Sequence, residues 1–530
     1  MLGLELIVAV GVSVLVCSAV AGRLRIAPPV LLLVCGALLG FAPALRVITL
    51  PPELMLLVFL PALLYWESVT TSLREIRSNL RAIVLSSTLL VVATAAAVAT
   101  VAHALGLAWG PAWVLGAAVA PTDATAVGVI ARGLPRRTMT ILRAESLVND
   151  GTALVIYGIA VGVTAGQEQL DAGHVAWRLV LAYAGGAVAG LLAAWLATRA
   201  RRLLDNPLQE NVVGIVTPFA AFLGAELMNA SGVLAVVICG LVLSQTTPRE
   251  VRADTRQLSQ AFWGLATFLL NGALFVLIGL QAHESVRDLS TAETAGALGA
   301  IGLVAAVVIG TRFGWTYTMP YVIRALDRRP QQRLRRVGAR QRLVTATCGF
   351  RGAVSLAAAL AVPELTSAGT PFPDRDKIVL ITSGVVVVTL VLQALALPAV
   401  VRWARLPADV AMAEEHRLAT RLAAEEAFVA LPDLAARLGV DDSVLHRTRG
   451  EYERHLEIIR LNPDSDTNDD EPIRRAEAEY NALRLELIAH KRATVVRLRD
   501  ERRIDDTVLR QIQARLDVEE IRLDRREVVD

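Results

Sequence analysis

Charged and aromatic residues are scarce in this sequence. Only 19% of its 530 residues are charged, and only 5% are aromatic. Basic and acidic residues nearly balance, at 53 against 50, and no basic stretch is interleaved with aromatic side chains. A nucleic-acid-binding surface usually shows such a basic stretch, so we expect no nucleic-acid partner.

Cysteine and histidine are also few. The four cysteines lie in apolar stretches without C-x-x-C spacing, which argues against a disulfide framework or a zinc site. We expect them to be packed or lipid-facing small residues. None of the seven histidines forms a cluster with Cys, Asp or Glu at ligand spacing, so we expect no cofactor and no resident metal centre.

Apolar residues, by contrast, make up 54% of the chain, and the mean hydropathy is +0.50. The core of a soluble domain cannot bury that much apolar surface, so we predict an all-α polytopic membrane protein. About thirteen transmembrane helices are expected, near residues 2–22, 27–44, 50–69, 80–105, 111–131, 141–165, 175–198, 211–229, 232–246, 258–281, 293–323, 341–362 and 378–403.

The distribution of arginine predicts the orientation of these helices. With the N-terminus outside, the connections expected in the cytoplasm are the arginine-rich ones, at 21–25, 71–81, 131–143, 198–202, 247–256 and 324–342. The opposite connections carry few basic residues or none, as the positive-inside rule requires. We expect a multi-pass plasma membrane protein with a cytoplasmic C-terminus.

The composition changes after about Leu406, where a charged, Leu- and Ala-rich region begins. We therefore divide the chain into a transmembrane domain, 1–405, and a cytosolic helical tail, 406–530. In this tail Ile504, Val508, Ile512 and Leu516 recur at every fourth residue, which predicts one apolar helix face. Such a face packs within the tail, forms a dimer contact or serves as a regulatory surface.

The sixth apolar stretch contains two carboxylates, in ESLVND at 145–150. A charge at bilayer depth costs about 2.5 to 3.5 kcal/mol on insertion scales, so a structural or functional role must account for each carboxylate. Helical rotation places Glu145 and Asn149 on one edge, and Ser146 and Asp150 on the adjoining edge. Together they form one polar arc, which must face protein or a water-filled cavity.

The fifth and twelfth stretches are interrupted by polar residues. Pro121 breaks or kinks the fifth beside Thr122 and Asp123, and carbonyl groups freed there can coordinate a cation. Arg351 interrupts the twelfth stretch between two glycines. These two stretches are seven spans apart, which is an odd number. If they are equivalent helices of two repeats, they therefore cross the membrane in opposite directions. This spacing predicts inverted repeats, spans 1–6 matching 8–13, with crossed broken helices at the substrate site.

Two further charges lie within apolar stretches, Arg312 in the eleventh and Glu67 in the third. An arginine cannot be neutralised by deprotonation, so Arg312 and Arg351 must each find a carboxylate, a carbonyl or water. We group them with Glu145 and Glu67 as candidates for structural ion pairs. For Glu67 a transport role is an equal alternative.

Four motifs resemble those of the first monovalent cation:proton antiporter family of sodium/proton exchangers. They are FLPALLYWES at 59–68, APTDATAV at 120–127, ESLVNDGTALV at 145–155 and GFRGAVSLA at 349–357. The resemblance implies a homodimer in which a core transport domain moves against a dimerisation domain. It also implies that Asp150 carries the ion, that Arg312 pairs with Glu145, and that the cation is surrounded by Thr122, Asp123, Glu145, Ser146 and Asn149.

The resulting hypothesis is a secondary antiporter that exchanges Na⁺ for H⁺ by alternating access and serves pH and sodium homeostasis. Deprotonated Asp150 would bind Na⁺ with oxygens of Ser146 and Thr122, and protonated Asp150 could not. We predict electroneutral 1:1 exchange, with a second proton on Asp123 as the alternative. A K⁺(Na⁺)/H⁺ antiporter and a cation channel are the rival functions. No G-x-S-x-G or H-E-x-x-H motif suggests an enzyme.

Overall fold

The computed structural model describes residues 2–24, 27–42, 55–71, 73–124, 127, 134–166, 172–287, 291–326, 338–406, 410–460, 471–501, 509, 512, 513 and 515–520. Among these residues the secondary structure is helical, apart from one isolated bridge between Leu365 and Pro371. The chain divides into two compact units, Met1–Ala408 and Asp409–Asp530.

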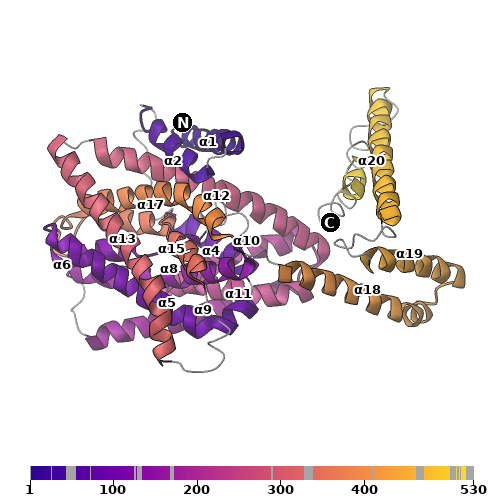
Figure 1. Ribbon diagram of the computed structural model, residues 1–530, viewed down its shortest axis with the longest axis horizontal. Helices are drawn as coiled ribbons and strands as arrows, with labels where there is room; N and C mark the ends of the chain where they lie inside the picture. The colour runs from indigo at the N-terminus through magenta and orange to yellow at the C-terminus, as the bar shows by residue number, and fades with distance from the viewer. Residues whose placement is uncertain are drawn as a thin grey trace. The chain divides into compact units, whose positions relative to one another are not determined.

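The first unit is a bundle of apolar helices (Figure 1). Eight of its described helices are long and apolar enough to cross a membrane: α1 (Leu2–Leu24), α5 (Leu73–Ala104), α8 (Arg136–Thr164), α9 (Ala172–Arg201), α10 (Pro207–Leu227), α12 (Ala253–Arg287), α13 (Thr291–Leu326) and α17 (Arg375–Ala404). The shorter helices are α2 (Pro28–Leu39), η1 (Met55–Phe59), α4 (Leu60–Thr70), α6 (Trp109–Val119), α11 (Gly232–Glu250), α15 (Ala339–Thr347) and α16 (Ala353–Leu360). Each predicted stretch overlaps one or two of them, which confirms the all-α polytopic class.

Three predicted stretches are not single α-helices. In the fifth, α6 ends at Val119 and residues 120–123 are not helical, because Pro121 has no N–H to donate and its ring would collide with the preceding turn. In the twelfth, residues 348–352 separate α15 from α16. The third begins with the π-helical turn η1 before α4, a feature that was not predicted from the sequence.

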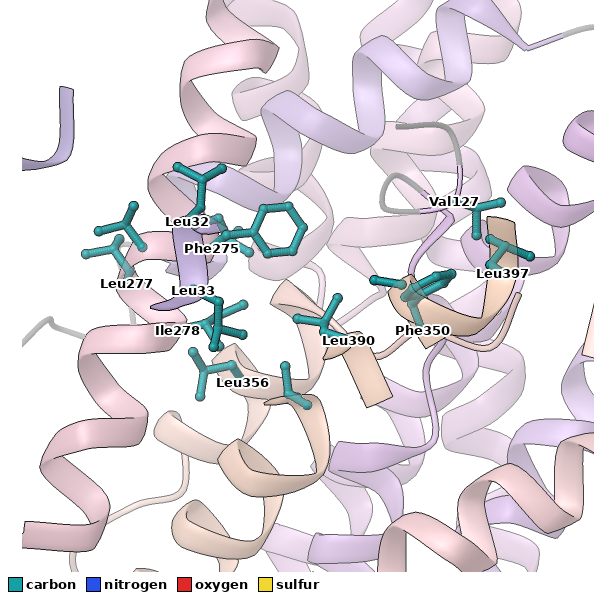
Figure 2. Packing of buried hydrophobic residues seen from close by; sticks show 14 of the residues in the cluster. Leu32, Leu33, Val127, Phe275, Leu277, Ile278, Phe350, Leu356, Leu390 and Leu397 are labelled. Carbon is teal, nitrogen blue, oxygen red and sulfur yellow. The ribbon is translucent and has the colours of Figure 1, made fainter. Parts of the chain in front are cut away.

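The largest cluster of buried apolar side chains holds α2, α12, α16 and α17 together (Figure 2). It reaches the break between α15 and α16 through Phe350, which is fully buried. Lipid tails are as apolar as leucine, so these side chains stabilise the bundle through close packing and not through removal from water. The labelled members are Leu32, Leu33, Val127, Phe275, Leu277, Ile278, Phe350, Leu356, Leu390 and Leu397.

The second unit contains α18 (Val410–Leu438), α19 (Asp442–Arg460) and α20 (Glu471–Asp500). Asp441 precedes α19, and hydrogen bonds from the side chain and backbone of Ser443 lower the pKa of its carboxyl. Ile512 and Leu516 pack against α20 around Ile488. For these two members of the predicted apolar face, packing within the tail is therefore observed. The other two, Ile504 and Val508, lie outside the described residues, as do positions 327–337 of the last arginine-rich connection.

Candidate cation-binding site

Hydrogen bonds join the two broken segments directly. The backbone N–H of Asp123 donates to the carbonyl oxygen of Phe350 at 2.8 Å, and Arg351 Nε donates to the carbonyl oxygen of Val119 at 2.7 Å. Val119 is the last residue of α6, so its carbonyl has no partner within the helix and lies at the negative end of the helix dipole. Arg351 also donates to the carbonyl oxygen of Gly349, at 2.6 Å. Two backbone carbonyl groups therefore accept hydrogen bonds from this buried guanidinium.

The glycines that flank Arg351 allow side chains to approach closely. A β-carbon at Gly352 would overlap the carboxylate of Asp123, and one at Gly349 would overlap the side chain of Arg312. Both positions therefore require glycine if the side chains of Asp123 and Arg312 are to keep their places.

The polar arc of α8 faces the break after α6. Ser146 Oγ donates to the carbonyl oxygen of Thr122 at 2.7 Å, and the amide of Asn149 lies 2.8 Å from the Thr122 hydroxyl. The geometry favours the amide orientation in which Thr122 donates to Asn149. The Asn149 NH₂ group then donates to the carbonyl oxygens of Glu145 and Ser87, each at 3.3 Å. These contacts hold the unwound segment against α8.

A cavity of about 40 Å³ lies between the unwound segment, α4, α8, α12 and α16. Three carboxylates line it, those of Glu67, Asp123 and Asp150, together with Thr122 and Ser146. A single water needs roughly 10 to 15 Å³ of such space, so the cavity can hold a cation with one or two waters. Asp150 is only 4% exposed, and its carboxylate accepts no hydrogen bond from another described residue.

Glu145 is engaged elsewhere. Arg312 Nη1 lies 2.7 Å from Glu145 Oε1, and Arg312 also donates to the carbonyl oxygen of Thr345 at 3.3 Å. The side chain of Arg312 is 3% exposed and that of Glu145 is 17% exposed. Of the residues predicted to surround the cation, Thr122, Asp123, Ser146 and Asp150 line the cavity, whereas Glu145 and Asn149 do not.

Arg351 and Glu67 are not members of the Glu145–Arg312 ion pair. Among the described residues neither of them forms an ion pair, since Arg351 is bonded to carbonyl oxygens. Glu67 is 9% exposed, and its Oε1 is buried without a hydrogen-bond partner in the described structure. Glu67 is therefore positioned as a wall of the cavity.

Two polar residues that line the cavity were not predicted from the sequence. Asn271 interrupts the apolar stretch FLLNGALF of α12, and Ser355 lies one turn beyond Arg351. Ser355 Oγ is buried and has no hydrogen-bond partner in the described structure. Asn271 could have been found in the sequence as a lone amide within an apolar stretch. Ser355 could have been found from its position four residues after Arg351.

Residues 11–403 match the family model described as sodium/hydrogen exchanger, transmembrane. The chain belongs to the sodium/hydrogen exchanger family. It is 45% identical over 529 residues to an uncharacterized Na(+)/H(+) exchanger of Mycobacterium tuberculosis, covering 98% of this chain and 96% of the relative. It is 28% identical to a sodium, potassium, lithium and rubidium/H(+) antiporter of Bacillus pumilus, over 68% of this chain and 56% of that one.

The fold of this exchanger is also that of a solved structure. The sodium proton antiporter MjNhaP1 from Methanocaldococcus jannaschii matches with a TM-score of 0.55 and 20% sequence identity, covering 77% of this chain and all of that chain. The chain therefore shares the fold of this antiporter, and the inverted-repeat relation between spans 1–6 and 8–13 stays a prediction. The exchanger is a membrane protein that carries out cation/proton antiport.

The cavity has the chemistry that cation/proton antiport requires. Carboxylate and hydroxyl oxygens are hard ligands suited to alkali and alkaline-earth cations. Carboxylates that share one buried cavity repel each other, so a bound cation or proton must balance their charge. Oxygens of this kind can hold either a cation or a proton.

Proposed function

We propose that the protein exchanges one Na⁺ for one H⁺ by alternating access, with Asp150 as the group that carries either ion. The observation that supports this most strongly is the small cavity in which Asp150, 4% exposed, faces Asp123 and Glu67 with no hydrogen-bond donor among the described residues. The Thr122 and Ser146 oxygens supply further ligands. The proposal includes a homodimer in the plasma membrane, with the N-terminus outside, that serves sodium and pH homeostasis.

The exchange follows from competition at one site. Deprotonated Asp150 binds Na⁺, and protonated Asp150 does not, so each ion excludes the other. The loaded site carries less net charge than the empty one, and moving the empty anionic site through a medium of low dielectric constant is costly. The conformational change therefore proceeds only with an ion bound, and flux of one ion is tied to flux of the other.

The stoichiometry follows from the number of groups that change charge. Arg312 neutralises Glu145, and the amide of Asn149 does not titrate. In the proposed cycle Asp123 and Glu67 keep their protonation states, so that Asp150 alone exchanges a proton for Na⁺. The cycle then moves no net charge across the membrane.

A second candidate is antiport of K⁺ as well as Na⁺. It is supported by the Bacillus pumilus relative, whose name includes sodium, potassium, lithium and rubidium. The oxygen ligands of the cavity suit each of these ions, because the choice among alkali cations depends on the fit of the cavity and not on the type of ligand.

The test is proton flux in proteoliposomes with Na⁺, K⁺ or Li⁺ in turn, for the native protein and for Asp150→Asn. We expect Na⁺-dependent proton flux that Asp150→Asn abolishes. The matched control is Glu364→Gln, an acidic side chain 85% exposed in the connection between α16 and α17, which should retain native flux. Cation-dependent flux that persists in Asp150→Asn would refute the single-site mechanism. Cation flux that needs no ion on the opposite side would identify a channel.

A further inference from the structure

A second and larger cavity, of about 400 Å³, lies where α4 ends, α5 and α8 begin, and α11 approaches its end. It shares no lining residue with the cation cavity. Its walls are largely polar, with the hydroxyl groups of Thr70, Thr71, Thr140 and Ser244. Cavities of roughly 300 to 1,000 Å³ are the size that small-molecule ligands occupy in proteins.

Two arginines give this cavity its charge. Arg74 comes from the first turn of α5 and Arg143 from the second turn of α8. None of the described lining residues is acidic, and neither arginine forms an ion pair with another described residue. Because guanidinium groups remain charged at any ordinary pH, the two arginines place positive charge in a concave space that has no acidic residue among its described lining residues. This space repels cations and attracts anions.

The size of the cavity and the placement of the arginines favour one kind of anion. Guanidinium groups bind phosphate through paired N–H···O bonds, and a phosphate group has enough oxygens for two guanidinium groups on different helices. A phosphate monoester carries a charge of about −1.5 to −2 at neutral pH and so nearly balances two arginines, which a single chloride does not. The volume leaves room for an organic group attached to the phosphate.

We propose that this cavity is a binding site for a phosphate-bearing anion. Such a group can come from a soluble phosphate ester or from the headgroup of an anionic lipid. The cavity is bordered by residues of the arginine-rich connections at 71–81 and 131–143, which we predict to be cytoplasmic, where both sources are present.

The experiment measures binding, and not transport, on the full-length protein purified in detergent. The midpoint of thermal unfolding is recorded while inorganic phosphate is added, with chloride used to match ionic strength. A parallel series adds phosphatidylglycerol or phosphatidylcholine to the detergent. We expect a saturable rise of the midpoint with phosphate, with phosphatidylglycerol, or with both, and none with phosphatidylcholine. Because a ligand that binds only the folded state raises its stability, the rise reports occupancy.

Variants assign the binding to the cavity. Arg74→Gln and Arg143→Gln should each weaken the apparent affinity by about tenfold or more, the expected loss of a hydrogen bond between charged groups. Arg143→Lys, which keeps the charge, should weaken it less. The matched control is Arg252→Gln, an exposed arginine paired with Asp205 outside the cavity, which should bind as the native protein does.

The outcomes distinguish a soluble phosphate ester from a lipid headgroup, and they test the anion site separately from ion exchange. A response to inorganic phosphate identifies a soluble ester site, and a response to phosphatidylglycerol alone identifies a lipid site. No response to any of these anions would overturn the proposal, and so would equal affinity in the native protein and both glutamine variants. A protein that exchanges no ions would still show this binding, so failure of the proposed function is seen separately.

Discussion

The buried pair of Glu145 and Arg312 offers the sharpest test of the energetics of the site. In Glu145→Gln the Arg312 guanidinium, 3% exposed, loses its carboxylate and keeps only uncharged acceptors among the described residues, the glutamine amide oxygen and the carbonyl oxygen of Thr345. Removing one partner of a buried ion pair costs about 3 to 5 kcal/mol, because the other charge stays buried. The loss should fall in this range.

Substitution of the arginine should lower the free energy of unfolding by less. In Arg312→Gln the remaining Glu145 side chain is 17% exposed, so water can reach part of its charge. We expect a loss of about 1.5 to 3 kcal/mol, the range for a hydrogen bond to a charged group. The double variant contains no charge at either position and should be more stable than Glu145→Gln alone. The expected coupling energy is about 1 to 3 kcal/mol.

The assay is thermal unfolding in detergent, followed by tryptophan fluorescence, for the native protein, the two single variants and the double variant. The control pair is Arg202 with Glu250, whose atoms are 2.6 Å apart but whose side chains are 57% and 28% exposed. Glu250→Gln should cost less than about 1 kcal/mol, as is usual for an exposed pair. If the double variant loses as much stability as the two single variants added together, the two residues are not coupled and the reasoning is wrong.

Three further predictions concern the ion site and the tail. Gly352→Ala should abolish exchange, because its β-carbon would overlap the Asp123 carboxylate, whereas Gly310→Ala, with open space around its β-carbon, should exchange normally in the same flux assay. A potassium-diffusion potential imposed across proteoliposomes should leave the final Na⁺ gradient unchanged, although it is worth about 2.3 kcal/mol per charge per 100 mV. A shift of that gradient would show that Asp123 or Glu67 carries a second proton. A chain that ends at Pro407 should still insert and exchange ions. A truncated protein that is folded but inactive at every pH would show that the tail takes part in transport.

The helices and their breaks could be predicted because a membrane restricts the sequence strongly. Polar groups in an apolar stretch are costly, so Pro121, Asp123 and Asp150 stood out against their surroundings. The period of the helix then placed Ser146 and Asp150 on one arc, and the structure turns that arc toward Thr122. For this arc the local sequence pattern was sufficient to predict which side chains share a helix face.

The pairing of Arg312 with Glu145 was expected only from the family resemblance, and the surroundings of the other buried charges could not be predicted from the local pattern. Arg351 could have found a carboxylate, a carbonyl or water, and only the packing of α6 beside it selects the carbonyl of Val119. Glu67 and Asn271 reach the cavity from α4 and α12, which are far from α8 in the sequence. Their contribution depends on how these helices pack, and hydropathy does not encode that arrangement.

The hydrogen bonds between the two broken segments also set the order of events during biosynthesis. Arg351 and Val119 are 232 positions apart in the chain, yet the ion site lies between their segments. The ribosome must therefore complete about two thirds of the protein before Asp123 and Asp150 acquire their final surroundings. Until then the segments of Asp123 and Asp150 enter the bilayer without the backbone contacts that the segment around Arg351 provides. Correct insertion of the early spans thus depends on their apolar residues, their flanking arginines and the contacts that they make with each other, such as that between Ser146 and Thr122.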